Sequence, residues 1–469
     1  MLKDIYLTFL KKNLKEILLV LLLLVVGFLP RFLDLGYSHF YGDETKTLYV
    51  DKTVPASQFL LNQRKGPVQF MVVWVMEKLT GGFDEGAIRL PFAIFGLASV
   101  VLLFLVVRKL YGIKAGFISA MLFSLNGFLI AFSRTAQYQS PLIFFGLLSI
   151  LLALYIKKER FYLSLILSSV SIALSFLCHY DAIFFLVPLL LLLWQKYKEL
   201  HLKLIHTLYF VMPFCLVLSV FYLPYVYGGY MVNNTVNYVQ RRLTGDTYAK
   251  NYSLYTIFIY NPFLIGNLML FLSSLSFFKQ DKKIFAVWFM TAFVVFQLVF
   301  LNPGTHIIHY LIPVIILVGA EISVLRGLIG KAITLLLILV LAIQFIYSMK
   351  TFVPRFGDGY PWSSNVNTDY HLYLYGFPYN RGWDQVRDYL YSKEGVRSFY
   401  TNDNAVMASY YLQRFDLTPM GANYLPQYYV YVRHPQEFFE PEPGFLLNYQ
   451  LERDFIVNGE VTTSLYKLK

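Results

Sequence analysis

RFLDLGYSHFYGDETKTLYVDKTVPASQFLLNQRKGP, residues 31–67, is the stretch from which the organisation of this chain can be worked out. It begins at the end of the first long apolar run, residues 17–32. It contains two adjacent carboxylates, Asp43 and Glu44, followed by Lys46 and, further on, by Lys65. In an ordinary solvated loop such charges have no special meaning. Where a membrane protein first leaves the bilayer they are candidates for chemistry, so the class of the protein decides the interpretation.

The composition is that of an integral membrane protein. Of 469 residues, 57% are hydrophobic and 14% are charged, whereas soluble domains are about half apolar and a quarter charged. The formal charge of +12 would also suit a nucleic-acid-binding protein, but basic residues that collect in cytoplasmic loops explain it more simply. Cys178 and Cys215 both fall in apolar runs, which favours small core residues over a disulfide or a metal site.

About eleven apolar runs are long enough to cross a bilayer, which takes roughly 17–25 residues. They are residues 17–33, 88–107, 116–133, 140–156, 162–178, 182–194, 206–225, 255–278, 284–301, 310–325 and 331–348. The first follows a basic head without a small-residue cleavage site, so we expect a signal anchor rather than a signal peptide. Residues 68–79 are apolar but too short to span, and we expect them to form an interfacial helix in the first external loop.

Every second short connection is basic, in phase with the basic N-terminus. These connections lie at residues 108–114, 157–160, 196–203, 279–283 and 326–331. The positive-inside rule places them and the N-terminus in the cytoplasm, and an odd number of spans then leaves the C-terminus outside. We therefore expect a multi-pass protein of the inner or plasma membrane.

Residues 349–469 differ in character from the rest of the chain, because the hydrophobic runs shorten and Pro, Asn, Asp and Tyr become more frequent. Helical spacing occurs at residues 383–391 and 405–412, and strand patterns occur at 397–400, 428–432 and 454–457. The expected fold class is an all-α polytopic membrane domain, residues 1–348, followed by a small extracytoplasmic α/β domain, residues 349–469.

On the outer face, this topology gathers charged and titratable residues from several loops. They are Asp43, Glu44, Lys46, Lys65, Arg134, His179, Asp181, Arg241, Arg242, His306 and His309. A site of this kind suits the transfer of a sugar from a lipid phosphate to an acceptor hydroxyl. A carboxylate takes the proton of the attacking hydroxyl, while Lys and Arg neutralise the leaving phosphate.

In these features the chain resembles the GT-C membrane glycosyltransferases, specifically the superfamily of the protein O-mannosyltransferases and the lipid A aminoarabinose transferases. The resemblance extends over roughly residues 15–350. The matching pieces are Asp43-Glu44, Arg64-Lys65-Gly66-Pro67 (similar to a Lys-Pro-Pro element of the family), Arg89-Leu90-Pro91, Ser133-Arg134, and His309-Tyr310 with Pro313.

The resemblance implies an inverting glycosyltransferase with a polyprenyl-phosphate-sugar donor. Its acceptor is a hydroxyl or phosphate of lipid A, a protein or a surface glycan. Asp43 matches the catalytic base, and Glu44 matches a partner that orients or binds. Lys46 and Lys65 match residues that hold the donor phosphate. The resemblance implies no metal, no other cofactor and no nucleic-acid partner. Gly66 replaces the usual proline, which should loosen the turn that carries Lys65.

Several of these residues also have purely structural explanations. Arg134 at a family arginine either faces phosphate or snorkels to headgroups, and Arg241 and Arg242 bind either substrate or anionic lipid. His309, next to Tyr310, is spaced to ligate a metal together with His306, but such histidines more often cap a helix.

His179 and Asp181 fit a structural hydrogen-bonded pair as well as a catalytic one. The competing functions for the whole chain are a transporter and a non-catalytic lipid-binding protein. The largely uncharged spans and the lack of repeated halves disfavour a transporter.

Overall fold

The computed structural model describes residues 2–82, 84–201, 203–244, 261, 263, 265–276, 279–300, 304–356, 380–418, 424–435 and 444–469. The chain divides into two compact units. The first comprises Met1–Leu33, Leu61–Gln69 and Phe92–Met349, and the second comprises Asp34–Leu60, Phe70–Pro91 and Lys350–Lys469. The second unit therefore contains most of the expected first external loop as well as the tail.

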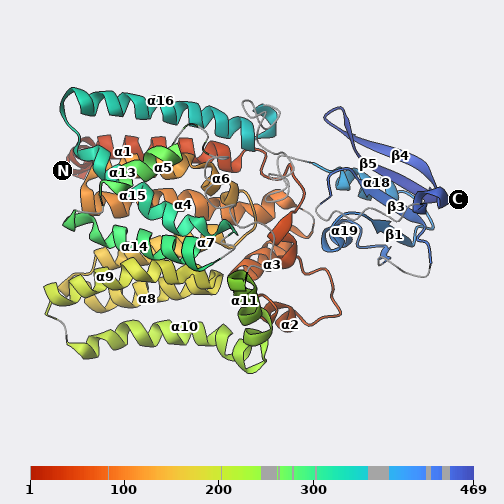
Figure 1. Ribbon diagram of the computed structural model, residues 1–469, viewed down its shortest axis with the longest axis horizontal. Helices are drawn as coiled ribbons and strands as arrows, with labels where there is room; N and C mark the ends of the chain where they lie inside the picture. The colour runs from red at the N-terminus through yellow and green to blue at the C-terminus, as the bar shows by residue number, and fades with distance from the viewer. Residues whose placement is uncertain are drawn as a thin grey trace. The chain divides into compact units, whose positions relative to one another are not determined.

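The first unit is a bundle of helices, many of which run side by side in Figure 1. Its helices, some of which extend into the second unit, are α1 (Leu2–Phe32), α4 (Glu85–Tyr111), α5 (Ile113–Leu125), α6 (Gly127–Ser133), α7 (Gln139–Leu154), α8 (Phe161–Cys178), α9 (Ile183–Glu199), α10 (Leu208–Tyr227), α11 (Asn237–Thr244), α13 (Ile265–Ser274), α14 (Lys283–Val294), α15 (Ile308–Val324) and α16 (Gly327–Phe352).

Helix α15 lies at the centre of this bundle. Its sequence is apolar on all sides, as expected of a helix that is surrounded by others, and its residues from Ile308 to Ile322 are buried. It packs closely on α5, because a Cβ at Gly319 would lie only 1.9 Å from the Ser119 hydroxyl oxygen. At its C-terminal end, Glu321 is paired with Lys279 and Lys282.

The apolar helices make the chain an integral membrane protein. Five helices are long and apolar enough to cross a membrane, or six if one bent pair is a single span, and three shorter apolar helices accompany them among the described residues. The outward side of α10 is strongly apolar, with Leu216 and Val220 70% and 77% exposed. The expected number of eleven spans stays a prediction, and much of the expected run 255–278 lies outside the described residues.

One expected span, residues 116–133, is broken into α5 and α6, which meet at an angle of 65°. The break occurs at Asn126, whose side-chain oxygen accepts hydrogen bonds from the amides of Phe128 and Leu129 at 3.1 and 3.2 Å. Asparagine in this role competes with the helical backbone and starts a new helix. The hydropathy of the run gave no indication of the break.

In the second unit, the loop segments form η1 (Gly42–Thr47), α2 (Ala56–Leu61) and α3 (Val68–Thr80). Helix α3 matches the expected helix at residues 68–79. It buries Phe70 and Val73, while Met71, Trp74, Val75 and Leu79 are 38–75% exposed. This exposed apolar stripe at helical spacing is what an interfacial helix presents to lipid.

The tail of the second unit folds as a small α/β domain around a mixed sheet (Figure 1). The elements are α18 (Trp383–Tyr391), β1 (Ser398–Thr401), α19 (Ala405–Tyr411), β2 (Asp416–Leu417), β3 (Tyr428–Val432), β4 (Tyr449–Val457) and β5 (Glu460–Leu468). The strand order is β2-β1-β3-β5-β4. β1 is parallel to β2 and β3, whereas β5 is antiparallel to β3 and β4. The expected α/β fold is confirmed.

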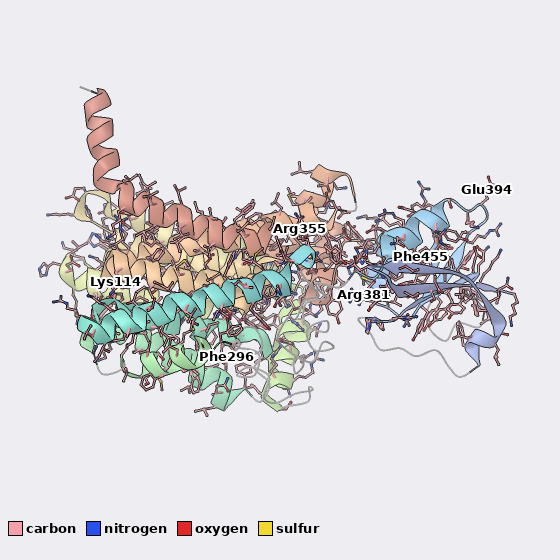
Figure 2. The ribbon with its side chains drawn as sticks, turned by 90° about the horizontal axis from the view of Figure 1, so that it is seen from above. Lys114, Phe296, Arg355, Arg381, Glu394 and Phe455 are labelled. Carbon is pink, nitrogen blue, oxygen red and sulfur yellow. The ribbon has the colours of Figure 1, made fainter. Side chains whose placement is uncertain are left out.

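Strand β5 and the first half of β4 were not predicted from the sequence. The hairpin between them is nevertheless indicated by Asn458-Gly459, a dipeptide that favours tight hairpin turns because both residues tolerate positive φ. Their φ values are 51° and 84°. Packing of Phe455 and Leu465 inside the domain then fixes the register, with Phe455 labelled in Figure 2.

The orientation in the membrane can be tested at the end of α11. If the alternation of basic connections sets the topology, Thr244 lies on the extracytoplasmic side. A cysteine placed there, in a chain whose Cys215 is replaced by serine, should react with a membrane-impermeant thiol reagent in intact cells or spheroplasts. Cysteine at Lys114 is the matched control for the opposite side. Labelling of Thr244→Cys only after permeabilisation would overturn the assignment.

Candidate functional site

Asp43, Glu44 and Lys46 all lie on the short helix η1 of the second unit. The carboxylate of Asp43 is about one-third exposed and forms an ion pair with Lys46, whose side chain is 61% exposed. An exposed pair of this kind contributes little stability. The carboxylate of Asp43 is therefore held in place without being withdrawn from solvent, as a base that must reach an acceptor hydroxyl requires.

Glu44, the next residue, has the opposite environment. It is fully buried, and its two oxygens accept hydrogen bonds from Nε and Nη2 of Arg89, both at 2.8 Å. One of the same oxygens accepts the amide of Tyr41 at 3.0 Å. Such a bidentate pair is directional as well as strong. Of the two roles expected for Glu44, this geometry favours orienting the loop over binding a substrate.

Arg89 connects this pair to the segment that precedes η1. Its Nη1 donates to the carbonyl oxygens of Leu35 and Ser38, and its Nη2 donates to that of His39 at 3.0 Å. A single guanidinium thus fixes three backbone carbonyls and the side chain next to Asp43. Only arginine offers this many donors in a rigid fork.

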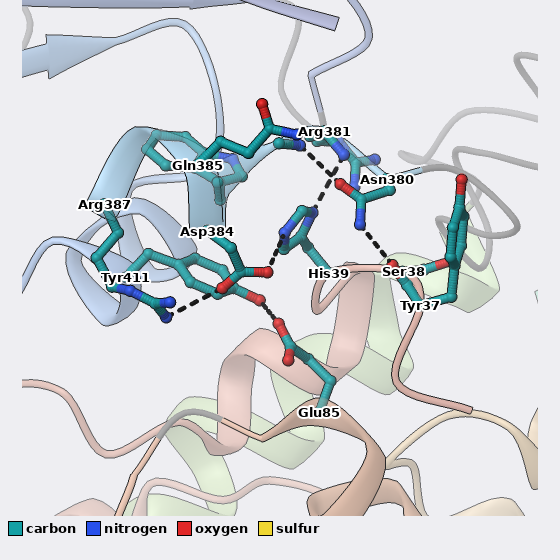
Figure 3. Close-up of polar contacts among 12 residues, drawn as sticks. Tyr37, Ser38, His39, Glu85, Asn380, Arg381, Asp384, Gln385, Arg387 and Tyr411 are labelled. Atoms are coloured by element: carbon teal, nitrogen blue, oxygen red, sulfur yellow. Dashed lines mark hydrogen bonds and ion pairs between the residues drawn. The ribbon is translucent and has the colours of Figure 1, made fainter. Parts of the chain in front are cut away.

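The same loop is bound to the tail through His39 (Figure 3). The Nδ1 atom of His39 accepts the backbone amide of Arg381 at 3.1 Å, so its Nε2 carries the proton and lies 3.3 Å from the Asp384 carboxylate. Beside this pair, the hydroxyl of Tyr411 donates to Glu85 (Figure 3). Helices α18 and α19 therefore hold the segment that leads into Asp43.

Electrostatics strengthen both contacts with the tail. Burial alone would raise the pKa of Asp384, but the hydrogen bond from His39 and the charge of Arg387 outweigh it, so the pKa lies below its usual value. Burial and the Glu85 carboxylate raise the pKa of Tyr411 well above its usual value. At neutral pH Asp384 is ionised and Tyr411 keeps its proton, as the two hydrogen bonds require.

In the first unit, Lys65 lies with its Nζ atom 4.8 Å from the centre of the Tyr138 ring. The next residue, Gly66, has φ of +120°, and a Cβ there would lie 2.2 Å from the carbonyl oxygen of Leu177. Proline, whose φ is fixed near −65°, does not fit this backbone. The expectation that Gly66 loosens the turn is therefore wrong: Gly66 is buried and lets the turn pack directly against the end of α8.

Two arginines, one of them next to Lys65 in the chain, share one aromatic ring. The guanidinium of Arg64 lies 3.6 Å from the centre of the Tyr238 ring, and that of Arg242 lies 4.7 Å from it. Arg242 also donates from Nε to the Tyr238 hydroxyl. Cations above an aromatic face are attracted by its negative charge distribution. Tyr238 thus allows two like charges to remain close together.

Asp181, which lies in η3 (Tyr180–Ala182), is surrounded by three histidines. His306 in η8 (Gly304–Ile307) and His309 in α15 both bond to its Oδ2, and the Asp181 amide donates to Nδ1 of His179 at 3.1 Å. Burial lowers the pKa of His179 to about 3 and also lowers the pKa of His306. Both imidazoles are therefore neutral at pH 7.

Three buried hydrogen-bond donors near these residues have no partner among the described residues. They are the Nε atom of Arg64, the hydroxyl of Tyr180 and the Nε2 atom of His179. Since Nδ1 of His179 accepts the Asp181 amide, its Nε2 carries the proton. Tyr180 and Arg242 line one small cavity of about 20 Å³, together with Tyr238, which is room for about one water molecule. Buried polar groups without partners are rare and require an explanation.

Two groups of side chains have the composition of a metal site. In the first unit, His179, Asp181 and His306 have possible ligand atoms within 4.8 Å of one another, and in the second unit so do His39, Glu85 and Asp384. In the second group, the His39 nitrogens bond the Arg381 amide and Asp384, and ligation through Nε2 would need the proton on Nδ1 instead. The same holds in the first group, where Nδ1 of His179 accepts the Asp181 amide, so either group would need a change of histidine tautomer to hold a cation.

The remaining candidate residues have structural surroundings. Arg134 is 4% exposed and donates from Nη1 to the carbonyls of Pro30 and Leu33, which caps the C-terminus of α1. Tyr310 is buried in the bundle and accepts a hydrogen bond from Gln297. Arg241 is exposed on α11. These positions fit a structural role for Arg134 and Tyr310 and leave the side chain of Arg241 accessible.

The comparisons with known proteins agree with this architecture. A family model described as dolichyl-phosphate-mannose-protein mannosyltransferase matches residues 64–225. Among solved structures, ArnT from Cupriavidus metallidurans bound to undecaprenyl phosphate has a TM-score of 0.61 and 15% identity, and the match covers 97% of this chain and 98% of that one. The apo state of the same protein matches over the same shares, with a TM-score of 0.57 and 15% identity. No curated protein sequence matches the chain significantly.

At this identity the likeness establishes the fold. The chain is a polytopic membrane protein with a small α/β tail and the GT-C fold. The family model over residues 64–225 and this structural likeness agree with the resemblance noted from the sequence.

From the sequence, Arg89 was part of a motif but had no predicted role, and His39, Tyr238 and Asp384 were not candidates. Arg89 had a usable signal, because an arginine at the start of an apolar helix requires an acidic partner. Asp384, the partner of His39, and Arg64, the distant partner of Tyr238, lie 345 and 174 residues away in the chain, and no local pattern indicated either contact.

The role of Arg89 leads to a stability prediction. Arg89→Ala leaves Glu44 buried without its partner, which typically costs about 3–5 kcal/mol, so the thermal unfolding midpoint in detergent should fall by several degrees. Arg108→Ala is the control, because Arg108 pairs with Glu16 while it is 38% exposed and such pairs contribute about 0–1 kcal/mol. Equal effects of the two substitutions would show that the Glu44–Arg89 pair does not stabilise the loop.

Proposed function

We propose that this protein is an inverting glycosyltransferase that moves a sugar from a polyprenyl-phosphate carrier to an acceptor hydroxyl or phosphate. The acceptor belongs to lipid A, a protein or a surface glycan, and the reaction takes place on the extracytoplasmic face of the membrane. The observation that carries the proposal is the set of buried donors without partners in the first unit, which lies among cationic side chains.

These donors have the chemistry of a phosphate site. Arg64 and His179 offer N–H groups and Tyr180 offers a hydroxyl that can donate, and an ionised phosphate group supplies acceptor oxygens for all three. The charges of Lys65 and Arg242 act on the histidines of this group, since Lys65 helps to lower the pKa of His179 and Arg242 helps to lower that of the neighbouring His306. Cations and oriented donors stabilise the charge that a leaving phosphate acquires.

Asp43 supplies the second half of the chemistry in this proposal. An acceptor hydroxyl loses its proton as it attacks the anomeric carbon, the bond from that carbon to the phosphate oxygen breaks, and the lipid phosphate leaves with the electron pair. The partly exposed carboxylate of Asp43 takes the proton, and attack from the side opposite the phosphate inverts the configuration. Glu44 and Arg89 orient the loop that carries Asp43, and Lys46 or Arg241 assists in binding.

The proposed reaction needs neither a metal ion nor another cofactor, because Lys and Arg neutralise the phosphate. A direct test is the release of polyprenyl phosphate from a polyprenyl-phosphate-linked sugar by the purified protein, with and without a chelator. Release that continues in the presence of the chelator supports the proposal. Loss of release that one divalent ion restores would instead show that the reaction needs a metal, for which the candidate ligands are the two groups described above.

Replacement of Lys65 tests the donor site. A charge-assisted hydrogen bond to phosphate contributes about 1.5–3 kcal/mol, so Lys65→Ala should lower kcat/KM for the donor by roughly tenfold to a hundredfold. Lys78→Ala is the matched control, because Lys78 lies on α3 with an exposed side chain. Unchanged donor kinetics in well-folded Lys65→Ala protein would remove this lysine from the donor site.

Replacement of Asp43 tests the catalytic base. Asparagine keeps the shape of the side chain but accepts a proton poorly, so Asp43→Asn should lower kcat by about a hundredfold to ten-thousandfold. Donor affinity, measured by titration in the same preparation, should change little. The control is Asp51→Asn, because Asp51 is an exposed carboxylate of the same loop that bonds to Thr53. Near-normal turnover would exclude Asp43 as the base, and equal loss of binding and turnover would indicate a structural role.

A further inference from the structure

A separate cavity lies among α8, α9 and α10. Its volume is about 450 Å³, which is within the range of small-molecule binding sites. The lining is almost entirely apolar and includes Phe161, Leu165, Leu193, Trp194, Phe210 and Val211. None of the residues proposed to bind the donor phosphate (Arg64, Lys65, His179, Tyr180 and Arg242) and no residue of η1 lines this cavity.

The cavity opens toward the side of the bundle that would face lipid. Trp194 and Val211, which form part of its wall, are 57% and 46% exposed. On the same helix as Val211, Met212 and Leu216 are 65% and 70% exposed. Exposed apolar side chains in this number are stable only against hydrocarbon, so an apolar chain can enter from the bilayer without crossing water.

One edge of the cavity is basic. Lys196 and His206 are part of the lining, and the Nζ atom of Lys198 lies 4.9 Å from the centre of the Trp194 ring. The connection between Ile156 and Phe161, which both line the cavity, carries the exposed residues Lys157 and Lys158. An apolar chamber with a basic edge matches a molecule that has a long apolar tail and an anionic head.

We infer that this cavity binds one anionic phospholipid, with an acyl chain among α8, α9 and α10 and the phosphate headgroup against Lys196 and Lys198. Basic pockets between membrane helices bind such headgroups, and each lysine near an anionic headgroup contributes about a fourfold to sixfold gain in affinity. Lys196 is paired with Glu199 at 2.7 Å. This pair is weak, because the Glu199 side chain is 61% exposed, and a phosphate can replace it.

The positive charge at the basic edge of the cavity favours an anionic phospholipid over other lipids. A zwitterionic lipid has the same tails but no net charge, so it does not gain from Lys196, Lys198 or their neighbours Lys157 and Lys158. A bound lipid of this kind would also fill the gap beside α10, of whose span only 6% is buried. The inference does not depend on the proposed transferase activity.

The test is native mass spectrometry of the purified, delipidated full-length protein in detergent. The probes are phosphatidylglycerol, phosphatidylcholine and undecaprenyl phosphate, each titrated separately. We expect one phosphatidylglycerol per chain, bound at least tenfold more tightly than phosphatidylcholine. The double variant Lys196→Gln, Lys198→Gln should weaken phosphatidylglycerol binding by about thirtyfold, on the basis of two lysine contributions.

A second variant tests the apolar chamber independently. Val211→Trp fills its opening, and because Val211 is partly exposed the substitution should not disturb folding; it should weaken binding of both phospholipids. Lys114→Gln is the matched control, since Lys114 is an exposed lysine at the start of α5 (labelled in Figure 2) and does not line the cavity. Lys114→Gln should bind phosphatidylglycerol as the unmodified chain does.

Four results would overturn the inference. The first two are equal binding of phosphatidylglycerol and phosphatidylcholine, and no binding of either phospholipid. The third is binding of phosphatidylglycerol by the lysine double variant and by Val211→Trp that equals its binding by the unmodified chain. The fourth is preferential binding of undecaprenyl phosphate that Val211→Trp abolishes. The last result would make the cavity a site for an isoprenoid lipid instead.

Discussion

The loop that carries Asp43 depends on the buried ion pair between Glu44 and Arg89. Two charges are removed from water there, and the arrangement is stable because every strong donor of the guanidinium is directed at a carboxylate or a backbone carbonyl. The neighbouring Asp43 can then stay partly exposed. Two adjacent acids of similar chemistry thus have different environments, because Glu44 is fully buried and Asp43 is partly exposed.

The tail adds a second constraint on the same loop. His39 lies between the Arg381 amide and the Asp384 carboxylate (Figure 3), and Arg89 bonds the His39 carbonyl. The α/β tail and η1 are therefore parts of one compact unit. A substitution in α18 can alter the geometry beside Asp43 although it lies some 340 residues further along the chain.

The first unit shows the complementary situation, in which polar groups are left unsatisfied. The carboxylate of Glu321 is paired with Lys279, Lys282 and Ser276. By contrast, donors of Arg64, Tyr180 and His179 have no partner among the described residues. Since leaving a buried donor unpaired costs about 1–3 kcal/mol, the fold retains these groups at a cost, and binding of an anion would offset it. The apolar cavity beside α10 is a second feature that a bound molecule would complete.

The sequence by itself determined the class of the protein and most of its elements. Apolar runs specify membrane helices, alternation specifies strands, and the helices α3, α18 and α19 were located to within a residue or two, because such patterns are local. Asp43, Glu44 and Lys65 were candidates from charge and order alone.

Only the tertiary structure decided what each candidate touches. Arg89 pairs with Glu44, and Arg134 caps a helix. The backbone at position 66 requires glycine rather than proline. His179, His306 and His309 surround Asp181. The physical reason is that hydrogen bonds and ion pairs depend on distances of about 3 Å between residues far apart in the chain. Neither hydropathy nor spacing contains those distances.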